Sequence, residues 1–144
     1  MANEKKNAKY WVTGDKPNLK LPSYRRMMDP RYVKRVLHLD EDVLPGAEFY
    51  GEVMWILPGS QKPLTQYDSH THTWGELIGF FGFNYDDIQD LGAEIEFTVD
   101  HEKKIITKSF AAFVPAGIQH GPLIIRNVVR PIFHFMSGPT KKYE

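Results

Sequence analysis

The strongest constraint on the fold is a succession of short apolar segments that turn residues interrupt at fairly regular intervals. From about residue 33 the segments are rich in β-branched and aromatic side chains, and none has a strong helical period. Glycine and proline mark breaks such as 58–63 and 115–122. The expected strands lie at 32–39, 49–57, 76–83, 93–99, 104–114, 123–129 and 131–137. About seven or eight short strands predict an all-β sandwich or barrel.

The length of the chain suits one domain. Its 144 residues contain no internal repeat and no linker. Residues 1–30 are polar and irregular, and the stretch at 14–24 holds two prolines and a glycine, which favour extended structure over helix. We therefore expect an extended N-terminal arm over 1–30 and a single β-domain over 31–144.

Charge and cysteine content exclude several classes of function. Eighteen basic residues balance eighteen acidic ones, which argues against a nucleic-acid partner or an anionic membrane surface. The first ten residues are polar, and no apolar run is long enough to span a bilayer, so a cytoplasmic location is expected. Because cysteine is absent, a metal site would depend on histidine, aspartate and glutamate.

A group of histidines and a glutamate is the main candidate site. His70 and His72 are one residue apart, and Glu76 has the same parity, so on a strand all three side chains would share one face. His120 follows a sharp turn built by Pro115 and Gly117, and is the natural fourth member. An isolated pair of histidines is commonly just exposed. Three imidazoles with a carboxylate, however, suit first-row divalent ions.

The spacing of these residues resembles two motifs of the cupin superfamily. Residues 70–76 have the form H-x-H-x-x-x-E, with Gly82 following, and residues 115–120 have the form P-x-G-x-x-H. Cupins are jelly-roll barrels, also called double-stranded β-helices. The resemblance implies that one divalent transition metal ion (iron, manganese, nickel, zinc or copper) is bound inside the barrel. The implied ligands are His70, His72, Glu76 and His120.

The chain departs from the family pattern in two places. Gly82 follows Glu76 by six positions where seven is usual, and the segment between the two motifs is longer than in minimal members. The polar arm over 1–30 lies outside the motif match. In such barrels an extension of this kind often packs across a partner subunit, so a homodimer is expected.

Two predicted strands add candidate catalytic residues. His134 shares its parity with Ile132 and Met136, and it could move a proton near the metal if that face lines the barrel. The alternative is a histidine satisfied within a packed strand. Tyr50 and Glu52 share one strand face, and a buried Glu52 would need a partner or a raised pKa. We predict His134, Glu52 and Tyr50 as candidate catalytic residues.

The resemblance leaves two classes of function open. One is a metal-dependent enzyme acting on a small organic molecule. Oxygenases are well represented in the family, which favours a dioxygenase over an isomerase, lyase or decarboxylase. The other is a non-catalytic module that binds or senses a small ligand with the help of its metal. In both cases the expected partner is a small molecule, with no nucleic acid and no membrane.

Overall fold

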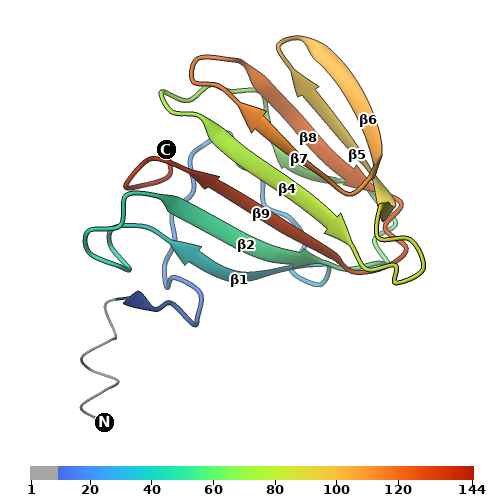
Figure 1. The fold of residues 1–144 in the computed structure, drawn as a ribbon, viewed down its shortest axis with the longest axis horizontal. Coiled ribbons are helices and arrows are strands. Elements are labelled where there is room, and N and C mark those ends of the chain that lie inside the picture. Colours follow the sequence, from blue (N-terminus) through green and yellow to red (C-terminus); the bar gives the residue numbers. More distant parts are fainter. Residues whose placement is uncertain (1–9) are drawn as a thin grey trace.

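Two antiparallel β-sheets face each other and enclose the core (Figure 1). The computed structural model describes residues 10–144, which contain nine strands and no α-helix. No helix in this part of the chain is long and apolar enough to span a membrane. The strands are β1 (Val33–Leu39), β2 (Tyr50–Ile56), β3 (Leu64–Tyr67), β4 (Glu76–Gly82), β5 (Asp90–Val99), β6 (Glu102–Lys108), β7 (Phe110–Val114), β8 (His120–Arg126) and β9 (Ile132–Gly138).

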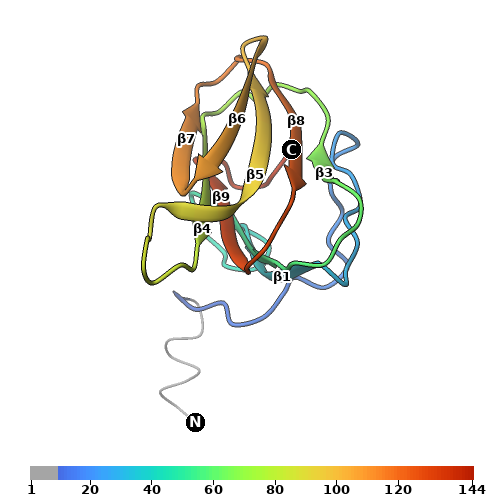
Figure 2. The ribbon, with the colours of Figure 1, turned by 90° about the vertical axis from the view of Figure 1, so that its right-hand side faces the viewer.

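Strands that are distant in sequence become neighbours in both sheets. The five-stranded sheet has the order β1-β2-β9-β4-β7, and the four-stranded sheet has the order β3-β8-β5-β6. Connections therefore pass repeatedly from one layer to the other, as the two views of the ribbon show (Figures 1 and 2). This arrangement confirms the predicted all-β jelly-roll class.

Three details of the strand prediction are wrong. The strand β3 was not expected. The segment predicted as one strand over 104–114 divides at Ser109, whose backbone N–H donates to the Gln89 carbonyl at 2.8 Å and so leaves the ladder. His70 and His72 also do not lie on a strand, apart from an isolated bridge between His70 and His120. Because β4 begins only at Glu76, these residues sit in a loop that enters the barrel.

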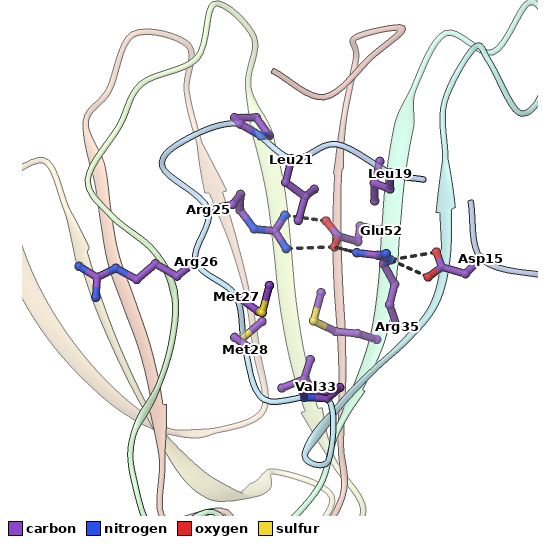
Figure 3. Close-up of a pocket in the computed structure, with 13 residues that line it drawn as sticks. Asp15, Leu19, Leu21, Arg25, Arg26, Met27, Met28, Val33, Arg35 and Glu52 are labelled. Carbon is purple, nitrogen blue, oxygen red and sulfur yellow. Dashed lines mark hydrogen bonds and ion pairs between the residues drawn. The ribbon is translucent and has the colours of Figure 1, made fainter. Parts of the chain in front are cut away.

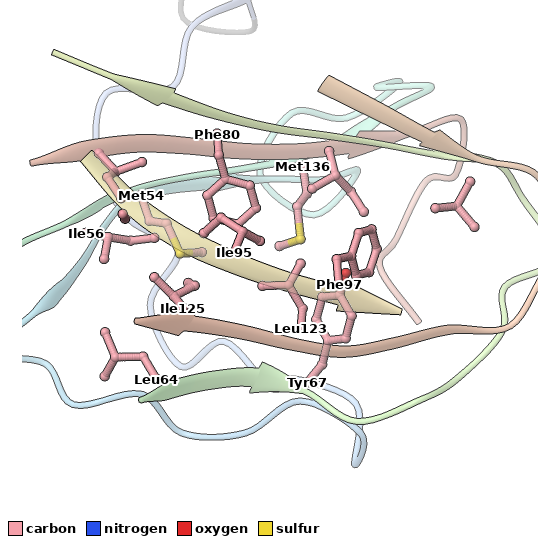
Figure 4. Close-up of a cluster of buried hydrophobic side chains, with 14 of the residues drawn as sticks. Met54, Ile56, Leu64, Tyr67, Phe80, Ile95, Phe97, Leu123, Ile125 and Met136 are labelled. Carbon is pink, nitrogen blue, oxygen red and sulfur yellow. The ribbon is translucent and has the colours of Figure 1, made fainter. Parts of the chain in front are cut away.

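The interior of the barrel has an aliphatic part and a polar part. The buried face of β2 carries Tyr50, Glu52, Met54 and Ile56, which point into the barrel. Figure 4 shows Met54 and Ile56 among the packed side chains between the sheets. Each such side chain stabilises the fold by about 1.5–3 kcal/mol when fully buried. Tyr50 and Glu52 lie further along the same row, where polar side chains replace the aliphatic ones.

The N-terminal arm pairs with the exposed edge of β3. The Arg26 N–H donates to the Gln66 carbonyl, and the Asp68 N–H donates to the Tyr24 carbonyl, each at 2.8 Å. In Figure 2 the arm, drawn in blue, passes beside β3. Pairing of this kind covers an edge that would otherwise be open. Residues 24–26 of the arm therefore lie along β3 of their own barrel in this structure.

Gly82, the glycine of the first motif, lies where β4 passes the start of β5. A Cβ added to Gly82 would lie 2.6 Å from the Leu91 carbonyl oxygen and closer still to that of Asp90. We expect Gly82→Ala to lower the free energy of unfolding by about 1–3 kcal/mol, since backbone must move to make room. Urea denaturation followed by circular dichroism measures this loss. Gly14→Ala is the control, because nothing lies within 4 Å of its added Cβ. Equal stability of the two variants would contradict the expectation.

Candidate metal centre

Three histidines from two distant segments meet at one end of the barrel. The backbones of His70 and His120 exchange two hydrogen bonds, of 2.9 and 3.0 Å, which join the loop after β3 to the start of β8. His72 follows in the same loop. One possible ligand atom from each histidine lies within 4.8 Å of the others, and the Nε2 atoms of His70 and His72 are 3.1 Å apart.

Glu76 brings a carboxylate to the same place. Its Oε1 atom lies 3.8 Å from His72 Nε2 and 3.6 Å from His120 Nε2, and the side chain is fully buried. The four residues that the motifs singled out therefore surround one small volume. These residues meet because the loop before β4 turns the histidines inward. They do not meet because their side chains share one face of a strand.

Backbone carbonyls set the orientation of two imidazoles. His70 Nδ1 lies 2.7 Å from the Asp68 carbonyl oxygen, and His120 Nδ1 lies 2.9 Å from that of Ile118. A carbonyl only accepts, so Nδ1 carries the proton and Nε2 keeps its lone pair toward the cluster. Burial, with a smaller effect of the neighbouring histidines, lowers the pKa of His70 to about 3. The ring is thus neutral at pH 7, as a metal ligand must be.

Two buried polar atoms of the cluster fit a bound cation. Glu76 Oε1 and His120 Nε2 have no hydrogen-bond partner among the described residues. A buried polar atom left in this state costs about 1–3 kcal/mol. A cation between the two atoms would satisfy both, and three imidazole nitrogens with one carboxylate oxygen form a donor set typical of first-row divalent ions. The residues present therefore fit the ion that the motifs imply.

Tyr50 holds the glutamate in place. Its hydroxyl donates to Glu76 Oε2, which leaves Oε1 directed at the histidines. Burial, and then the charge of Glu76, raises the pKa of Tyr50 well above its ordinary value, so the hydroxyl stays protonated and remains a donor. Of the three predicted catalytic residues, Tyr50 is the one that contacts the ligand set.

Aromatic rings cover the cluster, and two of them come from near the ends of the described chain. Tyr24 stacks on His70 with ring centroids 3.6 Å apart, and Trp74 stacks on His72 at 4.0 Å. Tyr143 stacks on Tyr50 at 4.8 Å. The roles of Tyr24 and Tyr143 were not predicted, because each lies in a polar terminal segment that carries no motif or period.

Glu52 is buried and paired. Arg25 Nη1 donates to Glu52 Oε2 at 2.8 Å and Nη2 donates to Oε1 at 3.0 Å, while an Arg35 nitrogen lies 3.8 Å from Oε1 (Figure 3). Burial alone would raise the pKa of Glu52, but the charge and hydrogen bonds of Arg25 outweigh it and the pKa is lowered. Glu52 is therefore an ionised partner in a salt bridge.

A pocket of about 550 Å³ opens beside this ion pair, between the arm and the first two strands. Glu52 and Arg25 belong to its wall, and Met27, Met28 and Leu21 give it apolar surface (Figure 3). Glu52 is one inward position from Tyr50 on β2, a separation of about 7 Å along a strand. Neither Tyr50 nor any of the four candidate metal ligands belongs to the wall of this pocket.

His134 belongs to a different buried group. Its Nδ1 lies 2.7 Å from the Gly79 carbonyl oxygen, its Nε2 lies 3.0 Å from the Gln66 side-chain amide, and its ring stacks on Phe80 at 3.7 Å. Burial lowers the pKa of His134 to about 4, so it is neutral at pH 7. These contacts favour the packed alternative, and proton transfer by His134 stays a prediction.

Removal of Arg25 should expose the importance of its pairing with Glu52. We expect Arg25→Met to lower the free energy of unfolding by about 3–5 kcal/mol, because it leaves a buried carboxylate without its main partner. Arg25→Met combined with Glu52→Met should recover much of this loss. Urea denaturation gives the free energy of unfolding of the unmodified protein, of Arg25→Met and of the double variant.

Arg31→Met is the matched control, because Arg31 pairs with Asp29 at the surface and its loss should leave stability nearly unchanged. A double variant less stable than Arg25→Met alone would show that the buried pair is not the cause.

Comparison with known proteins indicates the fold. No protein-family model and no curated relative matches this sequence. A solved structure of oxalate oxidase with the substrate analogue glycolate has a TM-score of 0.51 at 10% identity over 90% of this chain. This chain spans 60% of that longer one. A cupin protein from Bacteroides fragilis has a TM-score of 0.48 at 17% identity, over 83% of this chain and 86% of that chain.

The likeness at such low identity concerns the fold alone. The likeness to oxalate oxidase and the connections of the two sheets identify the fold of this chain as a jelly roll, the fold that the two motifs imply.

Proposed function

We propose that this protein is a metal-dependent enzyme that acts on a small organic molecule. His70, His72, Glu76 and His120 would hold one divalent transition metal ion. The observation that carries the proposal is the convergence of these four side chains, with Glu76 Oε1 and His120 Nε2 buried and unpartnered among the described residues. Such an ion supplies Lewis acidity or, if it is redox-active, a centre for oxygen chemistry.

The surrounding residues have distinct roles in this proposal. Tyr50 fixes the carboxylate of Glu76, while Tyr24 and Trp74 exclude water from the imidazole rings that they cover. The pocket beside Glu52 is of a size that suits a small organic ligand, and its methionines suit apolar surface on that ligand. Glu52 and His134 remain candidate catalytic residues, with Tyr50 the best placed of the three.

Dioxygenase chemistry is our first choice of reaction, ahead of isomerase, lyase or decarboxylase chemistry. Oxalate oxidase shares the fold and is an oxidase, which supports an oxygen-dependent reaction. A second candidate function is binding or sensing without catalysis. The aromatic cover over the histidines supports it, because a closed centre suits retention of a ligand.

Metal binding tests the ligand set directly. We expect the metal-free protein to bind one Mn²⁺ or Zn²⁺ per chain in isothermal titration calorimetry, and His72→Ala to abolish binding. Tyr50→Phe should weaken affinity by about 10–100-fold, because it frees the ligating carboxylate to rotate. His101→Ala is the matched control, since His101 is an exposed turn residue. Equal losses in His101→Ala and His72→Ala would contradict the assignment.

Oxygen uptake separates the candidate reactions. The metal-loaded protein is mixed with phenolic, thiol and keto-acid compounds, and oxygen consumption and product formation are followed. We expect consumption with at least one compound, and its loss in His72→Ala but not in His101→Ala. Product formation without oxygen consumption would move the assignment to an isomerase, lyase or decarboxylase. Tight ligand binding with no product would favour the binding function.

A further inference from the structure

The segment after β9 folds back over the candidate metal centre. We call residues 139–144, which form no strand, the tail. Gly138 pairs with Tyr50 at the start of β2, and the tail turns back there (Figure 1). The tail is polar except for Tyr143, whose side chain is only 8% exposed and lies among the aromatic rings of the centre. A short polar segment thus places one large ring at the end of the barrel where the four candidate ligands meet.

Tyr143 fills a space whose walls are aromatic. Its ring stacks on that of Tyr50 at 4.8 Å, and the ring of His72 lies 5.8 Å away, both between centroids. The other walls are the rings of Tyr24, Trp74 and His38, at 6.0, 6.1 and 6.4 Å. We call this space the aromatic slot. Rings packed at such distances accept another flat ring, and His72 places it beside the candidate metal centre.

Tyr143 does not satisfy the polar groups of the aromatic slot. Its hydroxyl is buried and forms no hydrogen bond of good geometry among the described residues, although Tyr24 and Arg25 are close to it. Arg25 Nε is also buried and unpartnered in the described part of the chain, and the guanidinium carbon lies 5.5 Å from the centroid of the Tyr143 ring. Buried polar groups are normally paired, so these exceptions point to another group that binds here. A ring whose oxygen accepts a hydrogen bond from Arg25 would satisfy a donor that Tyr143 leaves unpaired.

Outside this ring the attachment of the tail is weak. Lys142 pairs with Asp42 at 3.1 Å, and both side chains are exposed. Exposed pairs of this kind contribute little to stability. The backbone carbonyls of Lys141 and Glu144 also accept one hydrogen bond each, of 2.9 and 2.8 Å. The buried ring is therefore the main attachment of the tail, and a similar ring from solution can replace it.

A second pocket lies beside Tyr143. Its volume is about 280 Å³, and Tyr143, Lys142 and His38 belong to its wall. The same Tyr143 ring lies beside His72, a candidate metal ligand. Tyr143 therefore stands between this pocket and the candidate metal centre. Displacement of the tail would join the two spaces and open a path to the ligands.

We propose that the aromatic slot is the substrate subsite of the candidate metal centre, and that its ligand is a small aromatic compound with an oxygen substituent, such as a phenol. The tail is then an internal competitor, because its ring must leave the slot before the ligand enters. Arg25 borders both the slot and the pocket beside Glu52, so these spaces can receive different parts of one ligand. The inference rests on the proposed function, since it names a substrate class for the same centre.

Removal of the Tyr143 ring tests the competition. Tyr143→Gly, loaded with Zn²⁺, should bind one 4-methylphenol per chain in isothermal titration calorimetry, because this molecule has the shape of the missing side chain. We expect its affinity to exceed that of the unmodified protein by about 10-fold or more, since Tyr143 no longer occupies the slot. Tyr143→Phe should show no such gain. Tyr85→Gly is the matched control, because Tyr85 is 89% exposed. A non-aromatic compound of similar size, 4-methylcyclohexanol, should bind Tyr143→Gly more weakly.

A second variant decides the matter if Tyr143→Gly does not fold. Lys142→Glu places a negative charge beside Asp42 and loosens the tail, so it should raise the affinity for 4-methylphenol by about 2–5-fold. Lys108→Glu makes the same change of charge on β6 and should leave the affinity unchanged.

Two outcomes would overturn the proposal. One is a Tyr143→Gly protein, or a Lys142→Glu protein if the first does not fold, that binds 4-methylphenol no better than its control. The other is equal binding of 4-methylcyclohexanol. Zn²⁺ titrations of the same proteins distinguish this failure from that of the proposed function. Zn²⁺ binding without a gain in 4-methylphenol affinity overturns only the subsite, whereas an unmodified protein that binds no Zn²⁺ contradicts the proposed function.

Discussion

The buried ion pair of Arg25 and Glu52 is the interaction on which the arrangement of the polar end depends. Taking both charges out of water is costly, and the pairing is favourable only when its geometry is satisfied. It therefore selects one register of residues 24–26 against β3. A slip of one residue would turn Arg25 out of the barrel and remove Tyr24 from the His70 ring. The pair thus helps to position Tyr24, the residue before Arg25, against the His70 ring of the candidate metal centre.

The inward row of β2 shows how one strand serves both stability and chemistry. Ile56 and Met54 pack in the aliphatic core, Glu52 anchors the arm, and Tyr50 orients Glu76. Since alternate residues of a strand share a face, a single segment of seven residues passes from the core to the centre. The pocket beside Glu52 lies where the inward row of β2 changes from aliphatic to polar side chains.

The sequence predicts local features of this protein better than contacts between distant segments. Turn residues punctuate the strands clearly, and the two motifs identify the four residues that meet at the centre. Parity groups Tyr50 with Glu52 but does not say which face is buried, because that depends on the opposite sheet. The break at Ser109 depends on a hydrogen bond to Gln89, twenty residues away, which no local pattern encodes. Arg25 and Tyr143 lie in polar segments and acquire their roles only through tertiary packing.

Tyr24, which belongs to the aromatic cover described above, also makes a long-range contact that bears on how the cover forms. The Tyr24 hydroxyl donates to the backbone carbonyl of Glu144 at 2.8 Å, across 120 positions of the chain. Contacts of such long range form late, because the entropy of closing a large loop must be overcome first. The cover over the histidines therefore closes only when residues near both ends of the described chain have come together.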